Sequence, residues 1–176
     1  DYWKLNEDEV LFYLADVSGH GVTSSLLTSW MAAFHGRSKT PKELIQKLNT
    51  MLVQENIEKH ITMVAGILNT ITNEVQWCSA GHYPPPIIFE PDQAPQILST
   101  SSFPLGLIED LDIQEHRCVL NCHARFIVCS DGALELYDGG LNDQFNQLVE
   151  HLQKNAFKAP EHVADDIAIL SLCRMN

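Results

Sequence analysis

The chain has 176 residues, a length that fits one ordinary domain with a buried core. Its hydrophobic fraction of 45% and charged fraction of 19% are typical of a globular protein and exclude a disordered chain. The formal net charge of −12 argues against nucleic acid or an anionic membrane as partner. No apolar run approaches the about 20 residues that span a bilayer, and the irregularly spaced cysteines fit reduced thiols. These features predict a soluble, cytoplasmic, single domain over residues 1–176.

The first half of the chain is predicted to contain a buried strand, two helices and a hairpin. Residues 10–15 form an apolar run of strand length that leads into Asp16 and a Gly-rich turn. Apolar periodicity predicts a helix over residues 22–34, with one core-facing stripe, and a second helix that begins at Thr40 with a capping box. The stripe of the first helix comprises Leu26, Leu27, Trp30, Met31 and Phe34. Residues 62–68 and 74–79 predict a β-hairpin around a Thr-Asn turn.

The second half is predicted to consist of short strands and one helix. Because regular alternation of strand and helix is missing, a doubly wound parallel sheet is not expected, and the pattern favours a layered α+β fold. The expected strands are 87–89, 96–98, 112–118, 125–129 and 167–173, and the expected helix is 143–153.

Aspartates follow or precede apolar strands at three places. Asp16 and Asp131 each end a strand and run into glycine, and Asp165 stands before the closing strand. If the strands are neighbours, the carboxylates converge, and their burial would be costly without a cation. Mg²⁺ and Mn²⁺ prefer such oxygen ligands. The alternative is that each aspartate only caps a turn. This alternative accounts well for a single aspartate but less well for three aspartates at the ends of apolar strands.

Five sequence blocks resemble a known family. Residues 15–21 (Ala-Asp-Val-Ser-Gly-His-Gly), followed by an apolar helix, look like the signature of the metal-dependent protein phosphatase 2C (PPM) superfamily, and more specifically its bacterial SpoIIE/RsbU branch. Residues 79–86 are similar to the Ala-Gly-His-Pro-Pro block of that branch, and 104–107 to its Pro-Leu-Gly-Leu block. Residues 130–132 and 165–167 resemble its Asp-Gly and Asp-Asp motifs. The order of the blocks makes the resemblance specific, and it covers nearly the whole chain.

The resemblance implies an α-β-β-α sandwich of two antiparallel sheets flanked by helices. It also implies two divalent cations, Mn²⁺ or Mg²⁺, bridged by Asp16, with the Val17 carbonyl, Asp131 and Asp165 as further ligands. Asp1 resembles the aspartate of a Gly-Asp pair in the family and is a further expected ligand, although the glycines and the rest of the N-terminal strand are not part of the chain. The family's Pro-Gly-Asp turn is replaced here by residues 121–123.

The function implied by the resemblance is a serine/threonine protein phosphatase, with Asp16 and Asp131 as catalytic carboxylates. A water shared by the two metals would attack phosphorus in line, with no covalent intermediate. The expected substrate is a phosphorylated anti-sigma-factor antagonist. The expected partners are an upstream receiver or PAS-type regulatory domain, as in two-component and response-regulator systems, and a second copy in a homodimer.

Other interpretations remain open. The chain could be a non-catalytic adaptor of the same fold that binds a sigma-factor regulator, or a cyclic-nucleotide or small-molecule hydrolase with a two-metal site. His20 and His82 beside the motifs are expected to structure loops, with a general acid or metal ligand as the alternative role for His20. Zinc binding at residues 116–123 is disfavoured because the His and Cys spacing matches no common zinc motif. The residue that binds phosphate is not evident, and Lys4 and Arg37 are candidates by charge alone.

Overall fold

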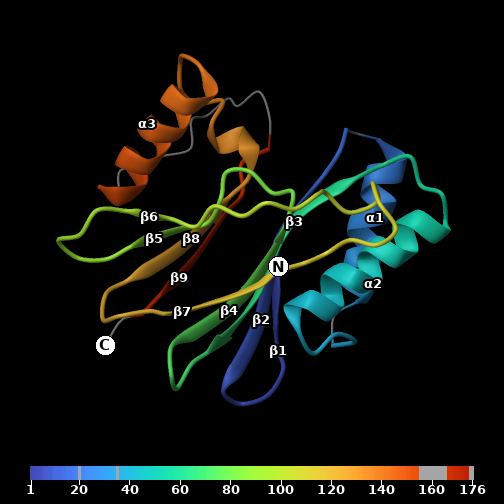
Figure 1. Cartoon of the computed structure of the whole chain (residues 1–176), viewed down its shortest axis with the longest axis horizontal. Coiled ribbons are helices and arrows are strands. Elements are labelled where there is room, and N and C mark those ends of the chain that lie inside the picture. Colours follow the sequence, from blue (N-terminus) through green and yellow to red (C-terminus); the bar gives the residue numbers. More distant parts are fainter. Residues whose placement is uncertain (20, 35, 155–165, 175–176) are drawn as a thin grey trace. The chain divides into compact units, whose positions relative to one another are not determined.

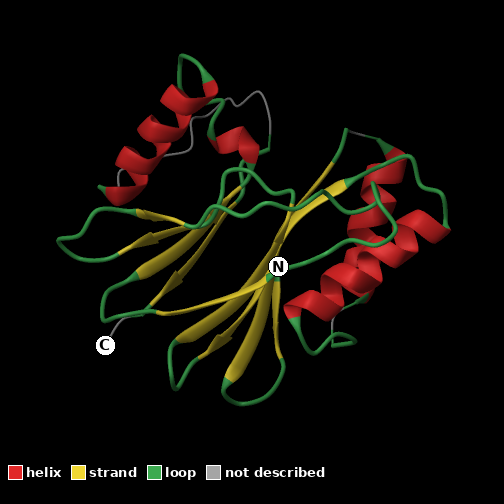
Figure 2. Ribbon diagram, viewed as in Figure 1, coloured by secondary structure: helices red, strands yellow, loops and turns green. Residues whose placement is uncertain are grey.

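The structure is a computed structural model that describes residues 1–19, 21–34, 36–154 and 166–174. The chain divides into two compact units. Unit 1 comprises Asp1–His82 and Thr100–Val119, and unit 2 comprises Tyr83–Ser99 and Leu120–Asn176. Each unit has its own antiparallel sheet and its own helices (Figure 2).

The sheet of unit 1 has five strands in the order β1-β2-β3-β4-β7, and all neighbours are antiparallel (Figure 1). Its longest ladder joins β2 to β3, from the pair Glu9–Asn69 to the pair Val17–Ile61. The hairpin between β3 and β4 is confirmed, with Asn73 in the left-handed conformation (φ 59°) that a tight turn requires. The strands are β1 (Tyr2–Lys4), β2 (Glu9–Val17), β3 (Ile61–Asn69), β4 (Glu74–Ala80) and β7 (Glu115–Val119).

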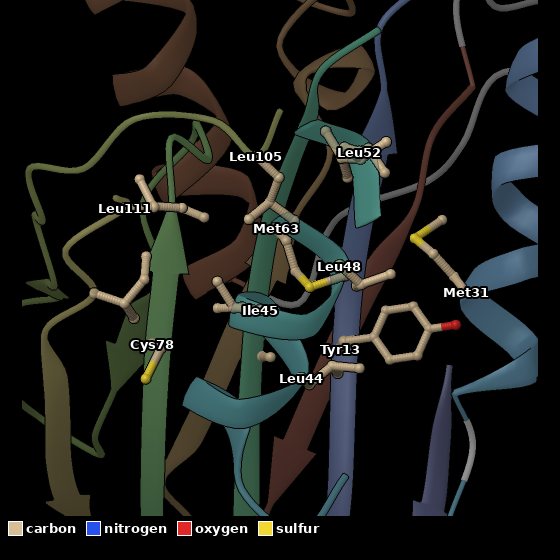
Figure 3. Close-up of a cluster of buried hydrophobic side chains, with 14 of the residues drawn as sticks. Tyr13, Met31, Leu44, Ile45, Leu48, Leu52, Met63, Cys78, Leu105 and Leu111 are labelled. Carbon is tan, nitrogen blue, oxygen red and sulfur yellow. The ribbon is translucent and has the colours of Figure 1, made fainter. Parts of the chain in front are cut away.

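Helices α1 (Val22–Ala33) and α2 (Pro41–Gln54) supply the other side of the core of unit 1. The predicted start of α2 is confirmed, because the Thr40 hydroxyl accepts a hydrogen bond from the Glu43 amide at 3.1 Å. The core combines apolar side chains of both helices with those of β2, β3 and β4 (Figure 3). Its labelled members are Tyr13, Met31, Leu44, Ile45, Leu48, Leu52, Met63, Cys78, Leu105 and Leu111.

The predicted apolar stripe of α1 is correct in part. Leu27 and Met31 are buried, and Phe34 packs against the core. Leu26 and Trp30 are instead 53% and 39% exposed. Residues 27, 31 and 34 repeat at the helical period and occupy the buried face, whereas residues 26 and 30 lie about 100° away around the helix axis.

The sheet of unit 2 has four strands in the order β6-β5-β8-β9, again antiparallel. Helix α3 (Leu141–Gln153) packs on it through Leu148 and Leu152. A 3₁₀ turn, Asp131–Ala133, follows β8 and was not expected from the sequence. The strands are β5 (Ile87–Phe89), β6 (Gln96–Ile97), β8 (Arg125–Cys129) and β9 (Ile169–Cys173).

Two antiparallel sheets with helices confirm the predicted α+β class. Most predicted elements are present, with β7 beginning at Glu115 rather than at residue 112. Tyr2–Lys4 forms a strand, β1, although the N-terminal strand was expected to lie outside the chain. Among the described residues, no helix is both long and apolar enough to cross a membrane.

Asn49 is a buried polar residue on the core face of α2, 3% exposed. Its amide nitrogen donates to the carbonyls of Ile108 and Glu109 at 3.0 and 3.1 Å. Its carbonyl oxygen accepts from the Gly106 amide at 2.9 Å. One side chain therefore satisfies three main-chain groups of the loop after residue 104.

We predict that Asn49→Leu, which keeps the size but removes the polar atoms, lowers the free energy of unfolding by about 2–4 kcal/mol. Urea denaturation of the purified chain measures this. The control is Thr50→Ala on the exposed face of the same helix, where we expect a change within about 0.5 kcal/mol. Equal stability of the two variants would contradict the structural role of Asn49.

Candidate functional site

Asp16 occupies the C-terminal end of β2, where it is partly buried. Its partner across the ladder is Thr62 of β3, whose hydroxyl lies 3.2 Å from Nδ1 of the buried His82. The aspartate motif and the Ala-Gly-His block therefore meet at one end of the sheet of unit 1. His82 has the structural environment expected for it, and His20 lies outside the described residues.

The main chain at Val17 is oriented away from β3. In an antiparallel ladder, successive residues direct their N–H and C=O groups to opposite neighbours. The Ser18 amide donates to the His60 carbonyl at 2.9 Å, on the β3 side. Val17, one residue earlier, therefore directs its carbonyl to the other side of β2, where β3 does not engage it. This orientation fits the expected use of the Val17 carbonyl as a ligand.

Asp1 is not brought next to Asp16 by strand pairing. The main chain of Asp1 exchanges hydrogen bonds of 2.7 and 2.8 Å with Tyr13, three residues before Asp16. Strand geometry puts that position about 10 Å from Asp16 along β2. Because side chains alternate between faces, Asp1 projects from the face of Tyr13 and Asp16 from the opposite face.

In unit 2, Asp131 opens the 3₁₀ turn after β8 and is exposed. The preceding Ser130 is buried, and its hydroxyl joins two strand ends. It donates to the Asp166 carbonyl at 3.1 Å and accepts from the Ala168 amide at 2.9 Å. The segment before β9 is therefore held beside the Asp-Gly motif. Asp165 itself lies outside the described residues.

Two glycines of the family blocks are close to other chain segments in unit 1. Gly81 has φ +59°, and a Cβ on it would lie 2.5 Å from the Pro104 nitrogen. Gly106 has φ +87°, and a Cβ there would lie 2.8 Å from the Lys59 carbonyl. Since a Cβ cannot approach that closely, glycine is required at both positions. The Pro-Leu-Gly-Leu block is thus packed against the Ala-Gly-His-Pro-Pro block and against the segment before β3.

Within the described ranges, no three His, Cys, Asp or Glu side chains are grouped closely enough to hold a metal ion. Asp165 is not included in this finding, and Asp16 and Asp131 belong to different units. Two histidines of the disfavoured zinc group, His116 and His123, lie in different elements. His116 stacks on Trp77 with 4.7 Å between ring centroids, and His123 lies in a turn at φ 63°.

The thiols of the core are not nucleophiles. All five cysteines are free, and burial raises the pKa of Cys129, next to Ser130, to about 12. The same cause, burial, raises the pKa of Cys78 to about 12 and that of Cys118 to about 11. A raised pKa disfavours the thiolate form, so none of these three thiols is suited to act as a nucleophile.

Sequence reasoning did not single out three residues that organise these loops. Asn49 carried a signal, because it is an amide on the apolar face of a predicted helix. Ser130 was quoted only as part of the Asp-Gly motif. Lys59 has no such signal in the sequence. Its ammonium lies beside Gly19, in the loop after Asp16, and the two residues are forty positions apart.

The fold is that of an α+β protein with two antiparallel sheets, and Asp16 and Asp131 each lie at the end of a strand. The family model described as "Stage II sporulation protein E (SpoIIE)" matches residues 6–174, so the chain belongs to this family. This confirms the resemblance to the SpoIIE/RsbU branch of the PPM superfamily.

Among curated proteins, "Phosphoserine phosphatase RsbP" of Bacillus subtilis (strain 168) is 25% identical over 144 residues, which are 76% of this chain and 35% of RsbP. The RsbU and RsbW domains of Rv1364c from Mycobacterium tuberculosis have a TM-score of 0.76 and 21% identity, over 96% of this chain and 54% of that one. RsbX, solved in complex with magnesium, has a TM-score of 0.67 and 17% identity, and the match covers 98% of this chain and 86% of the RsbX chain. The chain thus spans about a third of RsbP and half of the mycobacterial chain.

We predict that Ser130→Ala lowers the free energy of unfolding by about 1–3 kcal/mol, because the Ala168 amide and the Asp166 carbonyl lose their shared partner. Chemical denaturation followed by circular dichroism measures the change. Ser171→Ala on exposed β9 is the matched control and should change stability by less than about 0.5 kcal/mol. If the two substitutions have the same effect, the Ser130 hydroxyl does not hold the strand ends together.

Proposed function

We propose that the chain is the catalytic domain of a metal-dependent serine/threonine protein phosphatase. The observation that carries the proposal is the family match over residues 6–174, combined with the strand-end positions of Asp16 and Asp131. The relative RsbP is named a phosphoserine phosphatase, which supports the same substrate chemistry here. The reaction is hydrolysis of a phosphomonoester to the free hydroxyl side chain and inorganic phosphate.

The ligands proposed for two divalent cations, Mn²⁺ or Mg²⁺, are Asp16, the Val17 carbonyl, Asp131 and Asp165. Their chemistry fits, because carboxylate and carbonyl oxygens are the donors that hard cations prefer. The relative RsbX was solved with magnesium, which supports the choice of metal. Asp1 is proposed as a more distant member of the set, since its register directs it to the other face of the sheet.

The chain's own residues have three tasks in this mechanism. Asp16 and Asp131 hold negative charge at rigid strand ends and so fix the position of the reacting group. Ser130 keeps the segment before β9 in place beside Asp131. Gly21 has no side chain, and no other atom lies within 4 Å of where a Cβ would be, so the loop is open to a phosphorylated residue at this position. Bound divalent cations would neutralise phosphoryl charge and acidify the attacking water.

The biological setting is proposed from the family resemblance. The substrate is a phosphorylated anti-sigma-factor antagonist in the cytoplasm, and an upstream receiver or PAS-type domain regulates the activity. A homodimer formed through upstream segments is part of the same proposal. The exposed side chains of Leu26 and Trp30 on α1 provide apolar surface on which a regulatory partner could act.

We predict metal-dependent phosphate release from a phosphoserine protein and from p-nitrophenyl phosphate, restored by Mn²⁺ after EDTA treatment. Asp16→Asn and Asp131→Asn should each lower kcat/KM by about a hundredfold or more, because they remove a charged ligand without changing size. Asp92→Asn, an exposed turn aspartate at φ 57° in unit 2, is the control and should retain full activity.

The wild-type protein could be folded and bind the substrate protein, yet release no phosphate with either metal. This result would favour the non-catalytic adaptor over the enzyme. Activity that survives Asp131→Asn would remove that residue from the ligand set.

For Asp1 we predict a smaller effect. Asp1→Asn should raise the Mn²⁺ concentration required for half-maximal activity by less than Asp16→Asn does, because Asp1 lies three residues farther along the ladder and on the other face. A metal titration of both variants, in a protein extended before Asp1, measures this. A larger shift for Asp1→Asn would identify it as a direct ligand.

A further inference from the structure

The side chain of Lys59 lies on the loop that follows Asp16. A Cβ built on Gly19 would be 2.7 Å from the Lys59 Nζ, so the ammonium occupies the space that a side chain at Gly19 would fill. Gly19 has φ +71°, a conformation that favours glycine. Any other residue there would displace the ammonium from the loop. The backbone at Gly19, in the aspartate motif, therefore leaves room for the Lys59 ammonium.

The main chain around Lys59 is fixed by hydrogen bonds on both sides. The Ser18 amide donates to the His60 carbonyl at 2.9 Å, and the His60 amide donates to the Ser18 hydroxyl at 3.0 Å. Ile61 exchanges hydrogen bonds of 3.1 and 2.8 Å with Leu105. The Lys59 carbonyl also lies against Gly106. The long side chain thus starts from a rigid point beside the loop.

The Lys59 ammonium differs from other cations of the chain in its partners. Lys47, Arg117 and Lys154 each form an ion pair with a glutamate. No hydrogen bond or ion pair joins the Lys59 ammonium to the residues that the structure describes. Lys59 is partly buried, and its ammonium retains hydrogen-bonding capacity for a ligand.

The two cations suggested by the sequence are poorly placed by comparison. Lys4 pairs opposite Val10, six residues before Asp16, which is about 20 Å along the strand. Arg37 follows the far end of α1, a helix of 12 residues that begins just after the loop and is about 18 Å long. Only a cation within a few ångströms of the loop can contact a phosphoryl group held there.

We propose that Lys59 binds the phosphoryl group of the substrate, with its ammonium donating hydrogen bonds to a non-bridging phosphoryl oxygen. The proposal rests on the proposed phosphatase function and identifies a substrate-binding residue for it. A phosphoserine side chain carries a charge of about −1.5 to −2 at neutral pH, which a partly buried ammonium attracts strongly. Lys59 would act on substrate and not as a metal ligand, since an ammonium has no lone pair for a cation.

The test compares Lys59→Gln and Lys59→Arg with Lys4→Gln, a matched lysine in the same sheet. Because charge-assisted hydrogen bonds are lost, Lys59→Gln should lower kcat/KM for the phosphoserine protein about tenfold to a hundredfold. The inhibition constant of inorganic phosphate should rise by a similar factor. The Mn²⁺ concentration for half-maximal activity should stay within about twofold of wild type, and Lys59→Arg should retain part of the activity.

A second measurement separates this proposal from the proposed function. Isothermal titration of inorganic phosphate into the Mg²⁺-saturated protein reports binding even if the wild type shows no turnover. Weaker phosphate binding by Lys59→Gln than by Lys4→Gln supports the role of Lys59. Equal binding by these two variants, or no phosphate binding by the wild type, overturns it. A loss of kcat/KM that comes with a raised Mn²⁺ requirement and unchanged phosphate inhibition also overturns it, because Lys59 would then only order the metal loop.

Discussion

The pairing of β2 with β3 is the constraint on which the site of unit 1 depends. Nine residues of β2 are paired with β3 in a continuous register. Once one pair is fixed, the position of every other residue of β2 and the face of the sheet on which its side chain lies are fixed as well. A slip of one residue would turn Asp16 to the face of the helices and would bring Tyr13 out of the core. The buried residues Leu11 and Tyr13 on one face and Phe12 and Leu14 on the other oppose such a slip. The location of the acidic residue is thus a consequence of apolar burial.

From the end of this ladder, a series of short contacts runs through unit 1. Ser18 is joined to His60, Ile61 to Leu105, and Gly106 to Asn49 of α2. Each pair includes a hydrogen bond from a main-chain amide, at Ser18, Ile61 and Gly106. The bond to the buried Asn49 is costly to leave unsatisfied. The loop after Asp16 and the helix α2 are therefore connected by a series of hydrogen bonds and packed residues, although they are far apart in sequence. A rearrangement of α2 would have to break or move these bonds.

Local patterns in the sequence were sufficient for β2, the hairpin and the start of α2, because each depends on neighbours within a few residues. The Thr40 cap and the turn at Asn73 are of this kind. The exposure of Leu26 and Trp30 was not predictable from apolarity, since it depends on which part of α1 the sheet covers. The position of Lys59 depends on the chain folding back over Gly19, and no pattern of spacing reports such a contact. Family blocks identified the acidic residues, whereas the residues that hold their loops became visible only in three dimensions.

The charge of the chain makes the local arrangement of cations decisive. With 23 acidic and 11 basic side chains, the surface as a whole repels a dianionic phosphorylated residue. At physiological ionic strength, charges farther apart than about 8 Å are largely screened, so the approach of the phosphoryl group is governed by the groups immediately around it. Divalent cations at the aspartates would reverse the sign of the potential there, and an ammonium seated on the same loop would extend that positive region toward the substrate. An acidic protein could thus attract an acidic ligand where bound cations and an ammonium lie together.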